Sequence, residues 1–297
     1  MKIRANQIEI EVEDSGADGS QADRPVVVLV MGLGMQLIAW PPGFVRPLLE
    51  AGYRVIRFDN RDIGLSTSFD HLGVPNLLWV MLQHRLGFTP DAPYRLHDMA
   101  GDALGVLDAL GVARAHVVGV SMGGMIAQRM ALAAPQRLRS LTSIMSSSGA
   151  RGLPRADASV LRVMMARPAS AQRDAVVDHY VKLYRAIGSP AFPTPVDEMR
   201  QRIAFGLERS WRPAGTARQM VAIANDTGRA GELGKVAVPT LVLHGKADPL
   251  VPYACGQDTA RRIPDSRFVG FEGMGHDLPP PVVSMLLAAM LPHLQAH

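Results

Sequence analysis

Cysteine is almost absent from this sequence. Cys255 is the only one in 297 residues, so the chain cannot close an internal disulfide bond, and it lacks the cysteine sets of thiolate metal sites. The longest apolar run, around residues 26–35, is far shorter than the ~20 residues that a membrane span needs. The first 14 residues alternate charged residues with Ile and Val, unlike a secretory leader. We therefore expect a cytoplasmic protein without stable membrane association.

A strong excess of one charge is missing too. The chain has 31 Lys and Arg against 27 Asp and Glu, a net charge of +4, and the basic residues do not gather into runs that could follow a phosphate backbone. We expect no nucleic-acid partner. Residues 150–232 hold 13 basic and 8 acidic residues, so the excess belongs to this segment. A solvated helical surface explains it, and weak steering of anionic substrates is the alternative.

Short β-branched runs alternate with longer helical patterns along the chain, and no internal repeat is visible. This alternation predicts an α/β fold with a mostly parallel sheet. We expect a half-exposed strand at 8–12 and buried strands at 26–30, 54–58, 115–119, 141–145, 240–244 and 267–271. The expected helices are 42–51, 97–110, 122–134 and 282–291.

Residues 150–232 break this rhythm. The segment contains several amphipathic helical patterns with Met, Arg and aromatic residues, and no convincing strand pattern. We therefore predict a helical cap, or lid, at 150–232, inserted into an α/β core formed by residues 1–149 and 233–297.

A Gly-x-Ser-x-Gly motif at residues 119–123 lies between an expected strand and an expected helix. In this context the motif predicts a nucleophile elbow, a sharp turn that exposes a strained serine. Side chains two residues before or after Ser121 would collide with neighbouring elements, which explains Gly119 and Gly123.

A serine nucleophile needs a base and an acid that orients the base. Asp248 follows the strand expected at 240–244, and His276 follows the strand expected at 267–271. Each alone would be an ordinary turn or loop residue, but with Ser121 they give the order Ser, Asp, His. His244 is the only serious rival base, and we expect it to be structural or to line the pocket. Asp277 adjoins His276 and could not easily turn back to its ring.

The oxyanion that forms after attack on a carbonyl group needs hydrogen-bond donors. One should be the backbone amide of Met122, at the start of the helix that follows Ser121. The second should come from the loop at residues 31–34, where we assign the amide of Leu33.

With these residues in place, the chain resembles the α/β-hydrolase superfamily of serine esterases over nearly its whole length, with a helical cap after the sixth strand. Residues 59–66, Asp-Asn-Arg-Asp-Ile-Gly-Leu-Ser, resemble the family's Asp-x-Arg-Gly-x-Gly-x-Ser segment. Two positions depart from the wider family: Met31 replaces the His of the oxyanion loop, and Asp62 replaces a Gly. Together with Trp40, these departures resemble the branch of aclacinomycin methylesterase and related bacterial esterases.

The resemblance implies a cofactor-independent carboxylesterase that works through an acyl-enzyme on a small-molecule ester, and it requires no metal. An enol-lactone or carbon–carbon bond hydrolase, an acyltransferase and a non-enzymatic ligand receptor remain alternatives. As pocket residues we name Met31, Trp79, Tyr184, Trp211 and Val251. The apolar segment 71–93, which contains Trp79, is either a second wall of the pocket or a helix buried against the cap.

Overall fold

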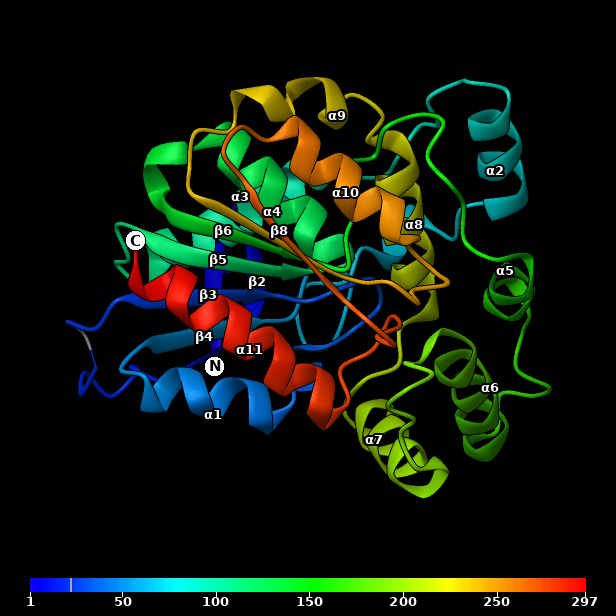
Figure 1. The fold of residues 1–297 in the computed structure, drawn as a ribbon. Helices are drawn as coiled ribbons and strands as arrows, with labels where there is room; N and C mark the ends of the chain where they lie inside the picture. Colours follow the sequence, from blue (N-terminus) through cyan, green and yellow to red (C-terminus); the bar gives the residue numbers. More distant parts are fainter. Residues whose placement is uncertain (22) are drawn as a thin grey trace.

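The structure is a computed structural model that describes residues 1–21 and 23–297. Its central element is a twisted sheet with the order β1-β2-β4-β3-β5-β6-β7-β8 (Figure 1). The strands are β1 (Lys2–Ala5), β2 (Ile8–Asp14), β3 (Val26–Val30), β4 (Arg54–Phe58), β5 (Ala115–Val120), β6 (Leu138–Ile144), β7 (Thr240–Gly245) and β8 (Arg267–Phe271). The β1–β2 and β2–β4 pairs are antiparallel, and all the other pairs are parallel.

The central strands are buried on both faces, as continuous apolar runs require in a parallel sheet. The expectation of a buried strand at 267–271 was wrong, because β8 lies at the edge of the sheet and its residues are half-buried or exposed. The sequence analysis also missed β1, a four-residue strand that forms a hairpin with β2.

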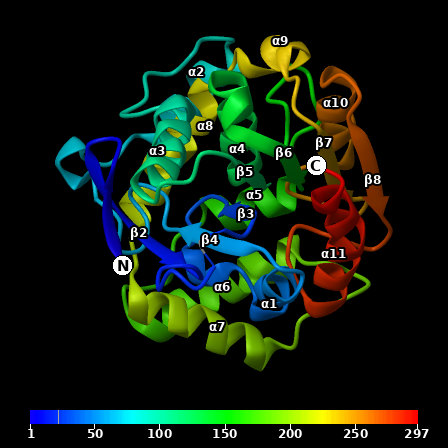
Figure 2. The ribbon, with the colours of Figure 1, turned by 90° about the vertical axis from the view of Figure 1, so that its left-hand side faces the viewer.

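Helices cover both faces of the sheet (Figures 1 and 2). One face packs against α1 (Pro42–Glu50) and α11 (Pro280–Gln295), and the other against α3 (Leu96–Ala109), α4 (Met122–Ala133) and α10 (Tyr253–Arg262). Two large apolar clusters fill these two layers. The four helices expected in the core are present, with ends that differ by up to four residues.

The chain between β6 and β7 forms further helices, of which α5 to α8 lie beside the carboxyl ends of the strands (Figure 1). They are α5 (Ala158–Met165), α6 (Arg173–Ile187), α7 (Val196–Arg209), α8 (Pro213–Asn225) and α9 (Arg229–Glu232). Helices α6 and α7 share a small apolar cluster of their own. The cap limits of 150–232 stay a prediction.

One further helix, α2 (Leu77–Arg85), comes between β4 and α3 along the chain and packs against α8. Only Val80 is buried among its described side chains, while Leu78 and Trp79 are 72% and 57% exposed. The expectation of ordinary helix burial against the cap was therefore wrong for most of this segment, because α8 covers only one side of α2.

Candidate active site

Ser121 lies in the sharp turn between β5 and α4. Its backbone has φ 55° and ψ −121°, a strained conformation for a residue with a side chain. A Cβ atom on Gly119 would lie 2.1 Å from the carbonyl oxygen of Gly123, and one on Gly123 would lie 2.0 Å from that of Val30. The two glycines therefore allow the close approach of β3, β5 and α4 that holds Ser121 at the strand ends.

The structure brings Ser121, His276 and Asp248 together from three separate loops. His276 Nε2 lies 3.0 Å from Ser121 Oγ, and His276 Nδ1 lies 2.7 Å from Asp248 Oδ2. A neutral imidazole with its proton on Nδ1 donates to the Asp248 carboxylate and leaves Nε2 free to accept from Ser121. This arrangement has the geometry that a serine nucleophile, a general base and an orienting acid require.

The Asp248 carboxylate is itself held in place. Its Oδ1 accepts hydrogen bonds from the amides of Leu250 and Val251 at 2.9 and 2.8 Å. The same loop is tied to His244, whose Nε2 lies 2.7 Å from the carbonyl oxygen of Val251. Burial lowers the pKa of His244, so a neutral ring that donates from Nε2 fits this contact. His244 thus supports the loop of Asp248, and Asp248 lies between the two imidazoles.

Asp277, the neighbour of His276, is bound elsewhere. Its Oδ1 accepts from the amide of Ser189 at 2.9 Å and from the Ser189 hydroxyl. Ser189 Oγ also accepts from the amide of Gly275 at 2.9 Å. Burial raises the pKa of Asp277. This carboxyl group therefore joins the end of α6 to the loop of His276, while Asp248 contacts the imidazole.

The two amides assigned to the oxyanion lie next to Ser121. Met122 is the first residue of α4, and Leu33 follows Gly32, where an added Cβ would lie 3.2 Å from the Cβ of Ser121. Within the described chain, neither amide donates a hydrogen bond to another residue. Both remain free to donate to an oxygen atom bound beside Ser121.

The loop that carries Leu33 is fixed by contacts on both sides. The amide of Gly34 donates to Gln219 Oε1 of α8 at 2.9 Å, and Asn60 Nδ2 donates to the carbonyl oxygen of Met31 at 2.9 Å. Gln219 Nε2 also reaches the carbonyl oxygen of Arg61 at 2.9 Å. The departure from His to Met at position 31 therefore leaves the backbone of this loop well anchored.

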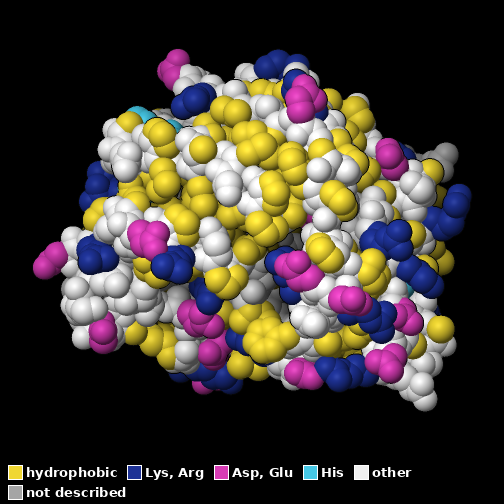
Figure 3. Space-filling model, turned by 60° about the horizontal axis from the view of Figure 1, so that its bottom comes forward, with side chains coloured by type: hydrophobic (Ala, Val, Ile, Leu, Met, Phe, Trp, Pro, Cys, Tyr) yellow, Lys and Arg dark blue, Asp and Glu magenta, His cyan; other side chains and the backbone are white. Residues whose placement is uncertain are grey.

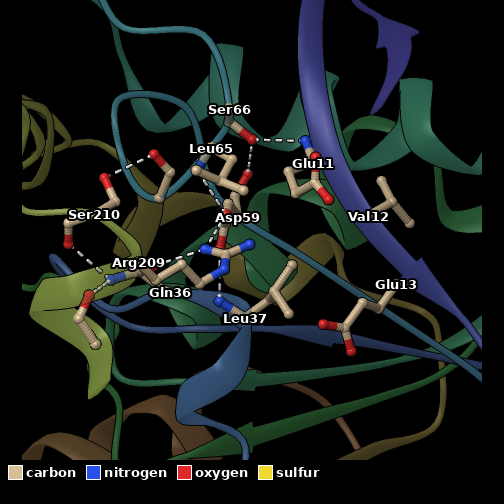
Figure 4. A network of polar contacts seen from close by, with 12 residues as sticks. Glu11, Val12, Glu13, Gln36, Leu37, Asp59, Leu65, Ser66, Arg209 and Ser210 are labelled. Atoms are coloured by element: carbon tan, nitrogen blue, oxygen red, sulfur yellow. Dashed lines mark hydrogen bonds and ion pairs between the residues drawn. The ribbon is translucent and has the colours of Figure 1, made fainter. Parts of the chain in front are cut away.

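An ion pair with the buried carboxylate of Asp59 continues this anchoring (Figure 4). Arg209, at the end of α7, donates from Nη1 to Asp59 Oδ2 and to Gln36 Oε1, both at 2.7 Å. Asp59 Oδ1 accepts from the amide of Leu37 at 2.7 Å, and Oδ2 accepts from that of Leu65 at 2.8 Å. Burial of Asp59 raises its pKa against the effect of these donors. One carboxyl group therefore joins β4, the oxyanion loop and a helix from between β6 and β7.

Asp62, the second departure from the family pattern, pairs with an arginine from the helices between β6 and β7, as Asp59 does. Its φ of 72° lies in the left-handed region where a glycine fits best. Arg218 of α8 donates to it from Nε and Nη2, both at 2.7 Å, and both side chains are buried. The bidentate pair explains why this chain keeps an aspartate at a strained position. Arg218 and Arg209 were not predicted from the sequence, although arginines within partly apolar helices were a signal.

The five residues named for the pocket are dispersed. Met31 is buried in the core, and Val251 is half-buried in the loop of Asp248. Tyr184 of α6 donates from its hydroxyl to Met35 Sδ at 2.9 Å, which places it against the oxyanion loop. Trp211 is 41% exposed after α7, and Trp79 lies on α2. Their role as pocket walls stays a prediction.

A cavity of about 430 Å³ lies beside the predicted triad, between the end of α6 and the loops of Asp248 and His276. Its lining includes Arg185, Ser189, Met199, Pro249 and Asp277, and none of the five pocket candidates. The proline-rich stretch 188–195 borders it. This composition was the only local sign in the sequence that the stretch could border a cavity.

The profile of the α/β hydrolase fold family matches residues 25–279. Rhodomycin D methylesterase from Streptomyces peucetius is 32% identical over 302 residues, which cover 94% of this chain and 93% of that protein. An esterase from Exiguobacterium antarcticum has a similar structure, with a TM-score of 0.74 and 21% identity over 99% of both chains. The enol-lactonase from Burkholderia xenovorans matches with a TM-score of 0.65 and 21% identity over 100% of this chain and 98% of the other.

These two structural likenesses show the fold, and the profile together with the methylesterase similarity shows the family. The chain belongs to the α/β-hydrolase family and is a hydrolase that resembles its methylesterase branch.

Proposed function

We propose that this protein hydrolyses small carboxylic esters through an acyl-enzyme on Ser121. The observation that carries the proposal is the chain of contacts from Ser121 through His276 to Asp248, at 3.0 and 2.7 Å. The similarity to a methylesterase supports an ester as the substrate. A cytoplasmic location, where thiols stay reduced, is compatible with a single cysteine that cannot close an internal disulfide bond.

In the first half-reaction His276 Nε2 takes the proton of Ser121 while Oγ attacks the ester carbonyl carbon. The negative oxygen of the tetrahedral intermediate accepts from the amides of Leu33 and Met122, and Asp248 stabilises the imidazolium. His276 then gives its proton to the leaving alcohol. In the second half-reaction His276 takes a proton from water while the water oxygen attacks the acyl carbon. The bond to Ser121 Oγ then breaks, His276 returns the proton to Oγ, and the carboxylic acid leaves.

The helices between β6 and β7 form the proposed cap and govern substrate choice. Tyr184 meets the oxyanion loop through Met35, and Arg209 and Arg218 fix α7 and α8 against the loops at 59–66. A cap held this firmly supports a preformed pocket roof. Chemistry then depends on the core and selectivity on the cap.

The test is a series of p-nitrophenyl esters of graded acyl length, with a fluorophosphonate probe added in parallel. We expect turnover of at least one ester and covalent labelling that peptide mapping places on Ser121. Labelling of another serine would refute the assignment of the nucleophile. Folded enzyme that labels at Ser121 yet hydrolyses no ester would direct attention to lactones or carbon–carbon bonds. Capture of the acyl group by added alcohol in preference to water would identify an acyltransferase.

A further inference from the structure

Helix α2 and the turn after it expose an unusual amount of apolar surface. We call this surface the α2 face, and it consists of Leu78, Trp79, Met81, Leu82, Leu86 and Phe88. Leu78 is 72% exposed and Phe88 is 63% exposed. Helices that are apolar on every side are normally covered, and exposed patches of large apolar side chains mark interaction sites. Because α8 covers only the side of Val80, the α2 face needs another occupant.

One arginine reaches the α2 face, and an arginine-rich segment follows it in the chain. Arg151 Nη2 donates to the carbonyl oxygen of Gly87 at 2.9 Å, within the turn between Leu86 and Phe88. The chain then continues into α5, which lies at the same edge of the molecule as α2 (Figure 1). Residues 151–173 contain five arginines and a single acidic residue, Asp157. The exposed arginines are Arg151, Arg155, Arg162, Arg167 and Arg173.

This bias is local. On the face shown in Figure 3, acidic and basic side chains lie next to one another over much of the lower half. On α6 and α7, Arg173, Arg200 and Arg202 pair with carboxylates, whereas Arg185 of α6 is exposed and has no ion pair among the described residues. Within the ion pairs of the described residues, Arg155, Arg162 and Arg167 have no carboxylate partner. An apolar surface beside unneutralised arginines therefore sits at one edge of the molecule.

We propose that the α2 face binds reversibly to the surface of a lipid bilayer that contains anionic headgroups. Large apolar side chains and Trp79 would enter the boundary between headgroups and acyl chains, and the arginines would meet the negative charge. A second copy of the chain fits less well, because a symmetric dimer places the same arginine-rich segment near its own copy. The proposal goes beyond ester hydrolysis and does not depend on it.

The dimensions agree with a surface contact. Helix α2 has nine residues and is about 14 Å long, half of the ~30 Å hydrocarbon core. Across the described residues, no helix has the length and apolar character to cross a membrane. The helix would lie in the plane of the surface, with Val80 toward α8. Our expectation that stable membrane association is absent is compatible with such a reversible contact.

The experiment is co-sedimentation of the purified protein with phosphatidylcholine vesicles, with and without phosphatidylglycerol. We expect binding to the anionic vesicles that weakens by at least ~10-fold without phosphatidylglycerol and falls as salt rises. Tryptophan emission should shift to shorter wavelength on binding, and Trp79→Phe should remove most of that shift.

Two variants separate the apolar and the charged contributions. Leu78→Ser with Leu82→Ser should weaken binding to anionic vesicles by about 10-fold or more, and so should Arg155→Glu with Arg162→Glu. The matched controls are Phe205→Ser and Arg200→Glu on α7, which should bind as the unchanged protein does. Circular dichroism and the unfolding midpoint verify that every variant folds.

Three results would overturn the proposal. The first is no binding to anionic vesicles by the folded protein. The second is equal loss of binding in the α7 controls. The third is a dimer in analytical ultracentrifugation that the Leu78→Ser, Leu82→Ser variant dissociates, without vesicle binding, because the α2 face would then be an interface between copies.

Discussion

The core and the helices between β6 and β7 depend to different extents on apolar packing and on ion pairs. In the core, two large apolar clusters fill the layers on either side of a mostly parallel sheet. Helices α6 and α7 share a small apolar cluster of their own, and α8 contributes Ala222 to one of the core clusters. Ion pairs with buried carboxylates also fasten α7 and α8 to the core, through Arg209 with Asp59 and Arg218 with Asp62. A hydrophobic layer tolerates small shifts in position, whereas the bidentate pair of Arg218 with Asp62 fixes one geometry. The ion pairs therefore set where the inserted helices sit over the site.

Because the predicted reacting groups lie in the core, the largest loss of activity is expected when the nucleophile in the core is replaced. Ser121→Ala should lower kcat for a p-nitrophenyl ester by about 10⁴- to 10⁶-fold, because no other group can form the acyl-enzyme. The small side chain fits the turn, so the unfolding midpoint should stay close to that of the unchanged enzyme. Stopped-flow and steady-state rates measure the loss. Activity within tenfold of the unchanged enzyme would remove Ser121 from the mechanism.

A second change in the core tests the orientation of the base. Asp248→Asn should lower kcat near neutral pH by about 10⁴-fold, because the amide favours the wrong tautomer of His276 and supplies no charge to stabilise the imidazolium. His244→Gln is the informative companion, since it alters the support of the loop at Val251 and leaves the carboxylate in place. We expect a much smaller loss in that variant. Equal losses in both would mean that loop position, and not the charge of Asp248, controls the rate.

The strands and helices of the core could be predicted because the residue patterns that indicate them are local in the sequence. The strands predicted at 26–30 and 54–58 have the same ends in the structure, since continuous apolar runs end at residues that break strands. Ser121, Asp248 and His276 could be named because each follows a strand, and parallel strands end at one edge of the sheet. The four-residue β1 strand offered too short a pattern.

The ion pairs that attach the inserted helices to the core could not be predicted from local patterns. Arg218 and Asp62 lie 156 residues apart, and nothing local to either residue names the other. The exposure of α2 was misjudged for a related reason. An apolar run shows that a surface prefers to be covered, but the cover depends on which neighbours the tertiary fold supplies, and α8 supplies only one side.

Stability should distinguish a buried ion pair from an exposed one. Arg218→Leu should lower the free energy of unfolding by about 3–5 kcal/mol, because it leaves the Asp62 carboxylate buried and without its bidentate partner. Adding Asp62→Gly to Arg218→Leu should restore a large part of the lost free energy of unfolding, because glycine adopts the positive φ readily and removes the buried, unpaired carboxylate. Arg200→Ala, at the exposed pair with Asp178, should cost less than about 1 kcal/mol. Urea unfolding curves measure all three.

Equal costs for Arg218→Leu and Arg200→Ala would contradict the assignment of the buried pairs as the attachment. Failure of Asp62→Gly to recover any stability would show that Arg218 acts mainly through its packing.

Acid should weaken the core through a buried histidine. His116 on β5 is buried, its Nδ1 lies 2.8 Å from Ser140 Oγ, and burial lowers its pKa to about 4. In the unfolded chain the pKa of this histidine is about 6.5, so protonation favours unfolding at acid pH. The stabilisation from the neutral ring is therefore fully present above about pH 6.5 and is lost as the pH falls toward 4. Between pH 7 and pH 5 the loss is about 2 kcal/mol. His116→Gln should make the free energy of unfolding less dependent on pH, and an unchanged slope would contradict a buried neutral ring.

The smallest expected effect concerns selectivity and tests the division of roles between core and cap. Tyr184 reaches Met35, next to the oxyanion loop, and Trp211 lies two residues after the end of α7. If either side chain lines the pocket, its replacement by alanine should change the ratio of kcat/KM between short and long acyl esters by about tenfold. Labelling of Ser121 by a small phosphonate should persist, because the reacting groups come from the core. Phe205→Ala, an exposed change of similar size on α7, is the control and should leave the ester ranking unchanged. An unchanged ranking in both pocket variants would limit the cap to covering the site and move the search for the acyl pocket to the cavity beside Ser189 and Asp277.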